Sequence, residues 1–344
     1  MFVALRDMRF AKGRFALMGG VVALITLLVV LLSGLTSGLG RANISAIEEL
    51  PADHLVFAAG DKLSFADSEL TARQVAGWRS AAGPGTVSTL GIGTGRLAAG
   101  GKSVTVAEFA VQEDSALPPT ALRGGVVLSA PAATDLGVTA GDRVRVGDTE
   151  LAVTAITGDQ SYSHLPVAWI PAAAATRPGV TVLAVRDSDA DLAAIDTRLA
   201  TRTVPVADSL SAIGSYTSEN GSLQLMRAML LAISALVIGA FFMVWTVQRA
   251  PEIAIVKAIG GSSRTLLIDA LGQALILLLA GTAVGAGIAA AIGTVAARVV
   301  PFVLEAGTVL LPAGAMVLLG LAGAALSLRR ITGVDPLTAL GAGR

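Results

Sequence analysis

Four long stretches without a charged side chain constrain this chain more than any other feature. Each has at least the ~20 apolar residues with which an α-helix crosses a hydrocarbon core of ~30 Å. Hydrophobic residues make up 53% of the chain and charged residues 15%, with a mean hydropathy of +0.72, which excludes an ordinary soluble domain and a disordered chain. The sequence therefore predicts a multi-pass membrane protein whose uncharged stretches are residues 15–40, 228–248, 270–297 and 306–328.

The charged residues divide the chain into four helices, one large domain and short connections. We predict transmembrane helices at residues 15–40, 265–297 and 306–328, and a helix over 209–248 that is first a stem and then the second span. Residues 41–208 form an α+β domain with a helical stem, between helices 1 and 2. The remaining segments are an N-terminal helix at 1–14, a loop with a coupling helix at 249–264, a short loop at 298–305 and a tail at 329–344.

Lysine and arginine residues close to the helix ends indicate the orientation in the membrane. The N-terminus, the loop between the second and third spans and the tail together carry ten basic residues against four acidic ones, whereas residues 42–226 carry 12 basic and 20 acidic residues. We therefore place both termini in the cytoplasm and the large domain outside a plasma membrane. Residues 1–14 fit either an amphipathic helix on the inner membrane surface or simple orienting charge.

The large segment has the patterns of a folded α+β domain. Residues 103–107 and 143–146 alternate between apolar and polar side chains, as half-buried strands do, and turn signals such as Gly100-Gly101 separate such runs. Helical spacing is found at residues 66–79 and 189–201, with Ser188 as the expected N-cap of the second helix.

No motif for catalysis, for a cofactor or for nucleotide binding is found. Gly101-Lys102-Ser103 is one residue too far from Gly95 for a phosphate-binding loop. The only two histidines, His54 and His164, belong to no metalloprotease motif, and the chain has no cysteine for disulfides or thiolate metal sites. Equal numbers of basic and acidic residues, 25 each, argue against a nucleic-acid partner. We predict no enzyme, no metal site and no cofactor, so active transport would need an ATPase on another chain.

Two cytoplasmic segments resemble FtsX-like ABC permeases. Pro251 suits the first position of a helix, Glu252 suits its positive end, and Gly260 suits its stop. The loop 248–263 is similar to that family's coupling segment, and residues 329–340 are similar to its closing segment. The resemblance implies a homodimer that docks two ATPase subunits. ATP would bind to those partner subunits. The docking residues it implies are Pro251, Glu252, Ile253, Ile255, Lys257, Ala258 and Gly260.

A narrower resemblance, to haem-exporter permeases of the HrtB type, covers nearly the whole chain. It begins at residues 33–45 and includes two further segments, residues 162–170 and 213–219. The resemblance implies detoxification by export of haem from the membrane, driven by the partner's ATP. Two alternatives stay open: mechanical transmission to an extracytoplasmic partner without transport, or efflux of another amphipathic compound.

Haem binding requires an apolar slot, an iron ligand and a cation for the carboxylates. Tyr216 and Glu219 are three residues apart and share a helix face. A tyrosine at this level is also a common interfacial anchor, and methionines there often only pack. Roles for Tyr162 and His164 come from the resemblance alone. The haem-binding candidates are Tyr216, Glu219, Tyr162, His164, Glu48, Arg41, Asn43, Met226 and Arg227.

Two pairs of glycines, Gly34 with Gly38 and Gly281 with Gly285, have the spacing that allows close helix contact. Such contacts could lie within one chain or between two copies.

Overall fold

The computed structural model describes residues 12–83, 85–248 and 262–332, which divide into two compact units. The membrane unit contains the described residues up to Gly38 and those from Ser222 onward, and the α+β unit is Leu39–Gly221. Both divisions fall inside helices, α2 (Lys12–Glu48) and α7 (Gly214–Gln248), so each of these helices contributes residues to both units.

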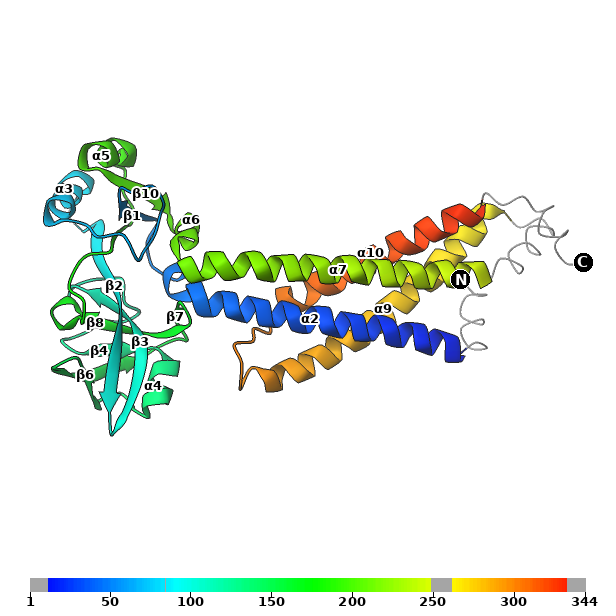
Figure 1. Ribbon diagram of the computed structural model, residues 1–344, viewed down its shortest axis with the longest axis horizontal. Coiled ribbons are helices and arrows are strands. Elements are labelled where there is room, and N and C mark those ends of the chain that lie inside the picture. Colours follow the sequence, from blue (N-terminus) through cyan, green and yellow to red (C-terminus); the bar gives the residue numbers. More distant parts are fainter. Residues whose placement is uncertain (1–11, 84, 249–261, 333–344) are drawn as a thin grey trace, which may run out of the picture. The chain divides into compact units, whose positions relative to one another are not determined.

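Four helices of the described chain are long and apolar enough to cross a membrane (Figure 1). The candidate spans are Phe15–Glu48 in α2, Gly214–Gln248, which is α7, Ile268–Ala296 in α9 (Ser263–Ala296) and Ala306–Ser327 in α10 (Ala306–Thr332). A helix satisfies its backbone hydrogen bonds within itself, which lipid cannot do for it. The predicted fold, with four transmembrane helices and an α+β domain between the first and second, is confirmed.

The membrane unit has its own core, to which all four helices contribute. Phe242 and Trp245 of α7 meet edge to face at 6.1 Å, and Trp245 also contacts Phe15 of α2 at 6.3 Å. Such aromatic pairs add stability beyond the apolar area that they bury. The buried members of this core are Met18, Val22, Val29, Ile238, Phe242, Trp245, Ala274, Leu277, Leu278, Met316 and Ala324.

The glycines at residues 281 and 285 bring α9 against α2 within the chain. A Cβ on Gly281 would lie 2.9 Å from Val22, and one on Gly285 would lie 2.9 Å from Thr26 Cβ. Real Cβ atoms do not approach other heavy atoms so closely, so the two backbones can meet here only because both residues lack a side chain.

The second glycine pair, Gly34 and Gly38 of α2, contacts a loop rather than another helix. The Phe302 ring occupies the space that a side chain on Gly34 would need, and the Pro301 carbonyl does the same at Gly38. A Cβ on Gly293 of α9 would lie 2.6 Å from the same ring, and Val303 N donates to the Gly34 carbonyl at 3.1 Å. The loop between α9 and α10 is therefore locked into a notch made by three glycines on two helices.

Strand β2 (Val87–Ala99) belongs to two sheets of the α+β unit. Its first part continues the strand order β10-β1-β9-β2. Its second part closes a ring of pairings that runs through β3, β8, β4, β6 and β5 back to β2. The other strands are β1 (His54–Ala58), β3 (Lys102–Val111), β4 (Val126–Leu128), β5 (Arg143–Val146), β6 (Thr149–Ile156), β7 (Ser161–Tyr162), β8 (Leu165–Pro171), β9 (Val182–Val185) and β10 (Thr201–Pro205).

Three apolar cores stabilise this unit. One packs α4 (Ala130–Leu136) with residues of the strand ring, and a second packs α3 (Ala72–Ala82) and α5 (Leu192–Leu199) with residues of β1, β2 and β9 around buried Trp78. The third joins the end of α2 to the sheets around Phe57, Phe109 and Trp169. Short helical turns complete the unit at α6 (Val206–Ser209), η1 (Ala172–Ala174) and η2 (Leu210–Ala212).

Three predicted helix starts are wrong, each for a local reason. The helix expected over 66–79 begins at Ala72, because Thr71 and Gln74 form a capping box. The helix expected over 189–201 is α5, whose N-cap is Asp191 rather than Ser188. The helix expected over 209–248 begins at Gly214, after a 3₁₀ turn and an extended Ile213.

Two predicted cytoplasmic elements fall largely or wholly outside the described residues. They are the amphipathic helix at 1–14, of which α2 includes only residues 12–14, and the coupling helix that begins at Pro251. Both stay predictions, as do the tail after residue 332 and the side of the membrane on which the α+β unit lies.

The notch for Phe302 makes Gly34 intolerant of a side chain. We expect Gly34→Ala to lower the free energy of unfolding by about 1–3 kcal/mol, because the added methyl overlaps the ring. Gly20→Ala is the matched control, since a Cβ at Gly20 meets nothing within 4 Å. Thermal unfolding of the purified protein measures both. Removing the ring with Phe302→Ala should make the Gly34 substitution nearly neutral, and equal costs in both backgrounds would contradict the notch.

Candidate functional site

The turn between β7 and β8 is docked on helix α2. Tyr162 pairs with Leu165, and the two residues between them, Ser163 and His164, have positive φ angles of 49° and 63°. Two residues in this conformation make the tight turn whose twist suits a hairpin. The turn's two N–H groups point to α2: Ser163 N donates to the Asn43 carbonyl and His164 N to the Ala42 carbonyl, each at 3.0 Å.

Three side chains meet at this turn, one from each of α2, α7 and the hairpin. His164 Nε2 lies 2.8 Å from Glu219 Oε2, and Asn43 Nδ2 lies 3.1 Å from the same carboxylate oxygen and 3.0 Å from His164 Nε2. Since Nε2 cannot accept from Asn43 and also donate to Glu219, we assign Nε2 a proton that it donates to Glu219. The carboxylate then accepts two hydrogen bonds, from the imidazole and from the amide.

Two serines extend this network behind the amide. Ser215 Oγ donates to Asn43 Oδ1, and Ser163 Oγ lies 2.9 Å from Ser215 Oγ, where it is the donor. Hydrogen bonds therefore run in one direction, from Ser163 through Ser215 and Asn43 to Glu219. We call Asn43, Ser163, His164, Ser215 and Glu219 the junction cluster.

Burial divides the junction cluster into a structural and an accessible part. Asn43 is 1% exposed, whereas the side chains of His164 and Glu219 are 36% and 39% exposed. An exposed ion pair contributes little to stability, while a buried amide costs free energy if its partners are lost. No hydrogen bond to His164 Nδ1 occurs within residues 12–83, 85–248 and 262–332. In the neutral tautomer with Nε2 protonated, Nδ1 carries the lone pair that a metal would need.

The two tyrosines lie against the core rather than among these polar groups. The Tyr162 ring packs edge to face on Phe65 and Phe109, at 6.0 and 5.7 Å, and burial raises the pKa of its phenol well above the ordinary value. Its ionised form, the one that ligates iron, is therefore disfavoured. Tyr216 is half-buried against the same core, while Glu219, three residues on, contacts Asn43 and His164.

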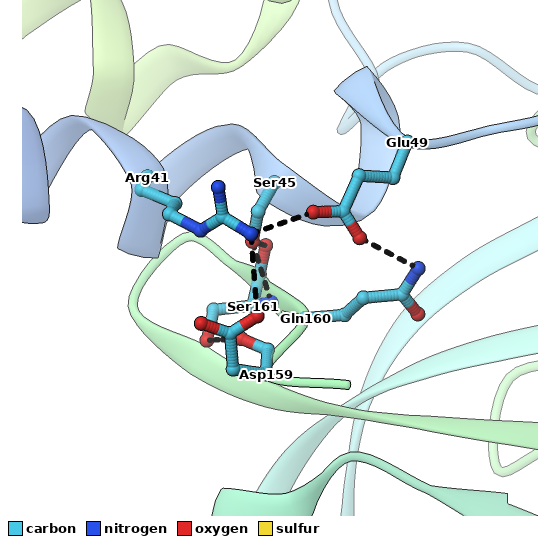
Figure 2. Close-up of polar contacts among 6 residues, drawn as sticks. All are labelled: Arg41, Ser45, Glu49, Asp159, Gln160 and Ser161. Atoms are coloured by element: carbon cyan, nitrogen blue, oxygen red, sulfur yellow. Dashed lines mark hydrogen bonds and ion pairs between the residues drawn. The ribbon is translucent and has the colours of Figure 1, made fainter. Parts of the chain in front are cut away.

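Arg41 belongs to a second polar group, shown in Figure 2. Its guanidinium contacts Glu49 Oε1 at 2.9 Å and Asp159 Oδ1 at 3.3 Å. Gln160 Nε2 donates to the other Glu49 oxygen at 3.2 Å, and Ser161 N donates to Ser45 Oγ at 2.9 Å (Figure 2). This group attaches the segment before β7 to the end of α2. Because two carboxylates already face it, Arg41 is a weaker candidate for holding haem carboxylates than its position in the sequence indicated.

The remaining candidates are not brought into the junction cluster. Glu48 is the last residue of α2 and is exposed. Its side chain has no hydrogen bond or ion pair within the described ranges. Met226 and Arg227 belong to the membrane unit, where Met226 is 48% exposed. All seven predicted ATPase-docking residues lie outside the described residues.

Sequence reasoning missed Ser215, Glu49 and Asp159. Ser215 had a signal, because it precedes Glu219 by one helical turn and so shares its face. Glu49 and Asp159 had none, since they are 110 residues apart in sequence and meet only through Arg41.

Residues 225–336 match the family model described as FtsX-like permease C-terminal. The whole chain is similar to a "Putative hemin transport system permease protein HrtB" of Staphylococcus haemolyticus, with 25% identity over 356 residues and 99% of each chain covered. A protein of the same name from Staphylococcus epidermidis is 25% identical over 351 residues, with 100% of each covered. An uncharacterised ABC transporter permease of Mycobacterium tuberculosis is 25% identical over 361 residues, with 99% of each covered.

Among solved structures, the periplasmic region of MacB from Actinobacillus actinomycetemcomitans is 12% identical, with a TM-score of 0.36, covering 48% of this chain and 94% of that one. A likeness of this size supports no conclusion about function.

The four spans define a multi-pass membrane protein. The chain carries an FtsX-like permease domain, as the coupling loop and the tail predicted.

The buried amide of Asn43 should be the part of the junction cluster that matters for stability. We expect Asn43→Ala to lower the free energy of unfolding by about 1–3 kcal/mol, because Ser215 and Glu219 each lose one of their hydrogen-bond partners. His164→Ala is the comparison, with an expected cost below about 1 kcal/mol, since the pair it breaks is partly exposed. Denaturant unfolding followed by tryptophan fluorescence measures both costs, and a larger loss for His164→Ala would reverse this assignment.

Burial of the Tyr162 phenol predicts that this side chain does not ionise at the ordinary pKa of a tyrosine. The chain has two tyrosines, so Tyr216→Phe leaves Tyr162 as the only one. Ultraviolet absorbance should show no tyrosinate as pH passes the ordinary pKa of about 10, because the folded state holds the neutral phenol. Folding stability should fall above that pH, where the unfolded chain releases the proton and the folded chain does not. Ionisation at the ordinary pKa without unfolding would contradict the burial of this side chain.

Proposed function

We propose that this permease exports haem, driven by ATP that two copies of a partner ATPase hydrolyse. The observation that carries the proposal is similarity over 99–100% of both chains to permeases whose names state hemin transport. This coverage includes the α+β unit and so extends well beyond the FtsX-like segment at residues 225–336. Transport of haem by this chain is an inference from those relatives together with the chemistry of the junction cluster.

The accessible half of the junction cluster has the groups that a haem site needs. His164 presents an imidazole that is one-third exposed, and Glu219 holds its Nε2 proton at 2.8 Å. A carboxylate that accepts from one ring nitrogen makes the other a better metal ligand. We therefore propose His164 as the iron ligand and Glu219 as the residue that orients it.

In this proposal, other predicted residues contact the porphyrin ring rather than the iron. Tyr216 would supply part of the apolar slot, because it is half-buried three residues before Glu219 on α7. Contacts of haem with Arg41, Asn43, Glu48, Met226 and Arg227 stay predictions.

The proposed mechanism depends on the continuity of α2 and α7. Each helix includes a candidate span and also residues of the junction cluster, Asn43 on α2 and Glu219 on α7. We propose that the permease is a homodimer with both termini in the cytoplasm, and that ATPase docking at the predicted coupling helix displaces α7 relative to α2. Such a displacement would separate Glu219 from Asn43 and His164, and expel a haem that entered from the outer leaflet.

The test is a haem titration of the purified permease, followed by its absorbance spectrum. We expect His164→Ala to weaken binding about tenfold, which equals about 1.4 kcal/mol, and to change the spectrum of the bound iron. Glu219→Gln, which keeps the shape of the side chain, should weaken binding less than Glu219→Ala. Tyr162→Phe is the matched control in the same hairpin and should bind haem as the parent does.

Unchanged affinity and spectrum in His164→Ala would remove this residue from the site. Stimulation of the partner's ATPase by haem, compared with a panel of peptides and antibiotics, separates haem export from efflux of another compound. A gene deletion that alters cell-wall cleavage without causing haem sensitivity would favour mechanical transmission.

A further inference from the structure

Strand β2 changes partners along its length and leaves one edge open. Residues Val87 to Leu90 pair with β9, from Val87 opposite Val185 to Leu90 opposite Val182. Pairing with β3, on the opposite side of β2, begins only at Gly91. The first four residues of β2 therefore have a neighbouring strand on one edge only.

The direction of the backbone groups shows which residues face the open edge. The Thr86 carbonyl accepts from Arg186 N at 3.0 Å and the Leu90 carbonyl from Thr181 N at 2.9 Å, so these residues face β9. Backbone groups alternate between the two edges along a strand. Val87 and Thr89 consequently direct two N–H and two C=O groups away from β9, and no hydrogen bond on that edge is found for them in the described part of the chain.

The chain leaves this edge open because β3 turns away. β3 ends at Val111, and Ser115 N donates to the Gln112 carbonyl at 3.0 Å in the turn that follows. Arg79 of α3 donates to the Gln112 side chain at 2.7 Å and holds this turn to one side. A groove of about 590 Å³ results, lined by the edge of β2, by Arg79 and Ser80, and by Gln112 and residues Asp114 to Ala116.

We propose that an extended segment of another polypeptide binds in this groove by adding a strand to the edge of β2, in line with β3. Two donors and two acceptors at strand spacing are complemented by a peptide backbone. Sheet edges that stay open attract other chains, and proteins normally shorten or cover them. Arg79 and Asp114 both line the groove, so it suits a segment with charges of both signs. The proposed partner is thus a protein with such an extended segment, and no residue of the junction cluster lines the groove that it would occupy.

Hydrogen exchange of the full chain in lipid nanodiscs, read at single amides by mass spectrometry, tests the open edge. The amides of Val87 and Thr89 should exchange at least about tenfold faster than that of Ser88, which bonds to β9. Equal protection of all three amides would overturn the proposal, because the edge would already be covered.

A synthetic strand then tests the binding. The probe is a blocked octapeptide of alternating valine and threonine with one lysine and one glutamate. At about millimolar concentration it should slow exchange at Val87 and Thr89 and leave Ser88 unchanged. The same peptide with an N-methyl group on every amide should have no effect, because neither of its edges can then donate hydrogen bonds to β2. Absence of protection by the unmodified peptide, or equal protection by both peptides, would overturn strand addition.

Two variants test whether peptide binding depends on the backbone of the open edge or on the side chains near it. Thr89→Pro removes an outward N–H group, which an edge position tolerates, and should abolish protection of Val87 by the peptide. Ser88→Ala changes a neighbouring side chain but no outward backbone group and should bind as the parent does. Protection of Val87 and Thr89 that grows with permease concentration alone would identify a second copy as the occupant and overturn the assignment to another polypeptide. Neither variant changes the junction cluster, so haem binding should be the same in both.

Discussion

The amide of Asn43 is the interaction on which the candidate site depends. It is buried on α2, it accepts from Ser215 and donates to Glu219 of α7, and it lies against His164 of the hairpin. An amide with both ends engaged has one orientation, so it fixes how these elements meet. Because leaving such a group without partners costs free energy, any displacement of α7 against α2 at this level must be offset by new contacts.

The accessible side chains of the cluster have a different role from the buried amide. His164 and Glu219 are more than one-third exposed, so their pairing is worth little as stability and can be exchanged for a ligand at low cost. The opposite holds for Tyr162, whose phenol is kept neutral by burial. Arg41 is intermediate in how readily it can bind a ligand, since it must release the two carboxylates that it contacts before it can bind another anion.

The membrane fold could be predicted from sequence because charge and length alone decide which segments cross a lipid bilayer. The alternating strands at residues 103–107 and 143–146 were found for a similar reason, since the period of two is local. Helix starts were missed where a capping side chain competes with a neighbour, as Asp191 does with Ser188. The Gly34 and Gly38 pair was interpreted as a helix contact, but its partner is a loop that periodicity cannot find. In the candidate site, His164 came from family resemblance and Asn43 from its position near the end of the first helix, and their meeting with Ser215 is a tertiary contact that no local pattern contains.

We propose that α2 and α7, which each contribute residues to both units, transmit motion that another protein generates. This permease should therefore move haem only when that protein hydrolyses ATP. The most direct test is haem movement across vesicles that contain the chain, with and without its ATPase subunit and ATP. We expect haem export only when permease, ATPase and ATP are all present. Export by the permease alone, or no export by the complete complex, would contradict the proposal.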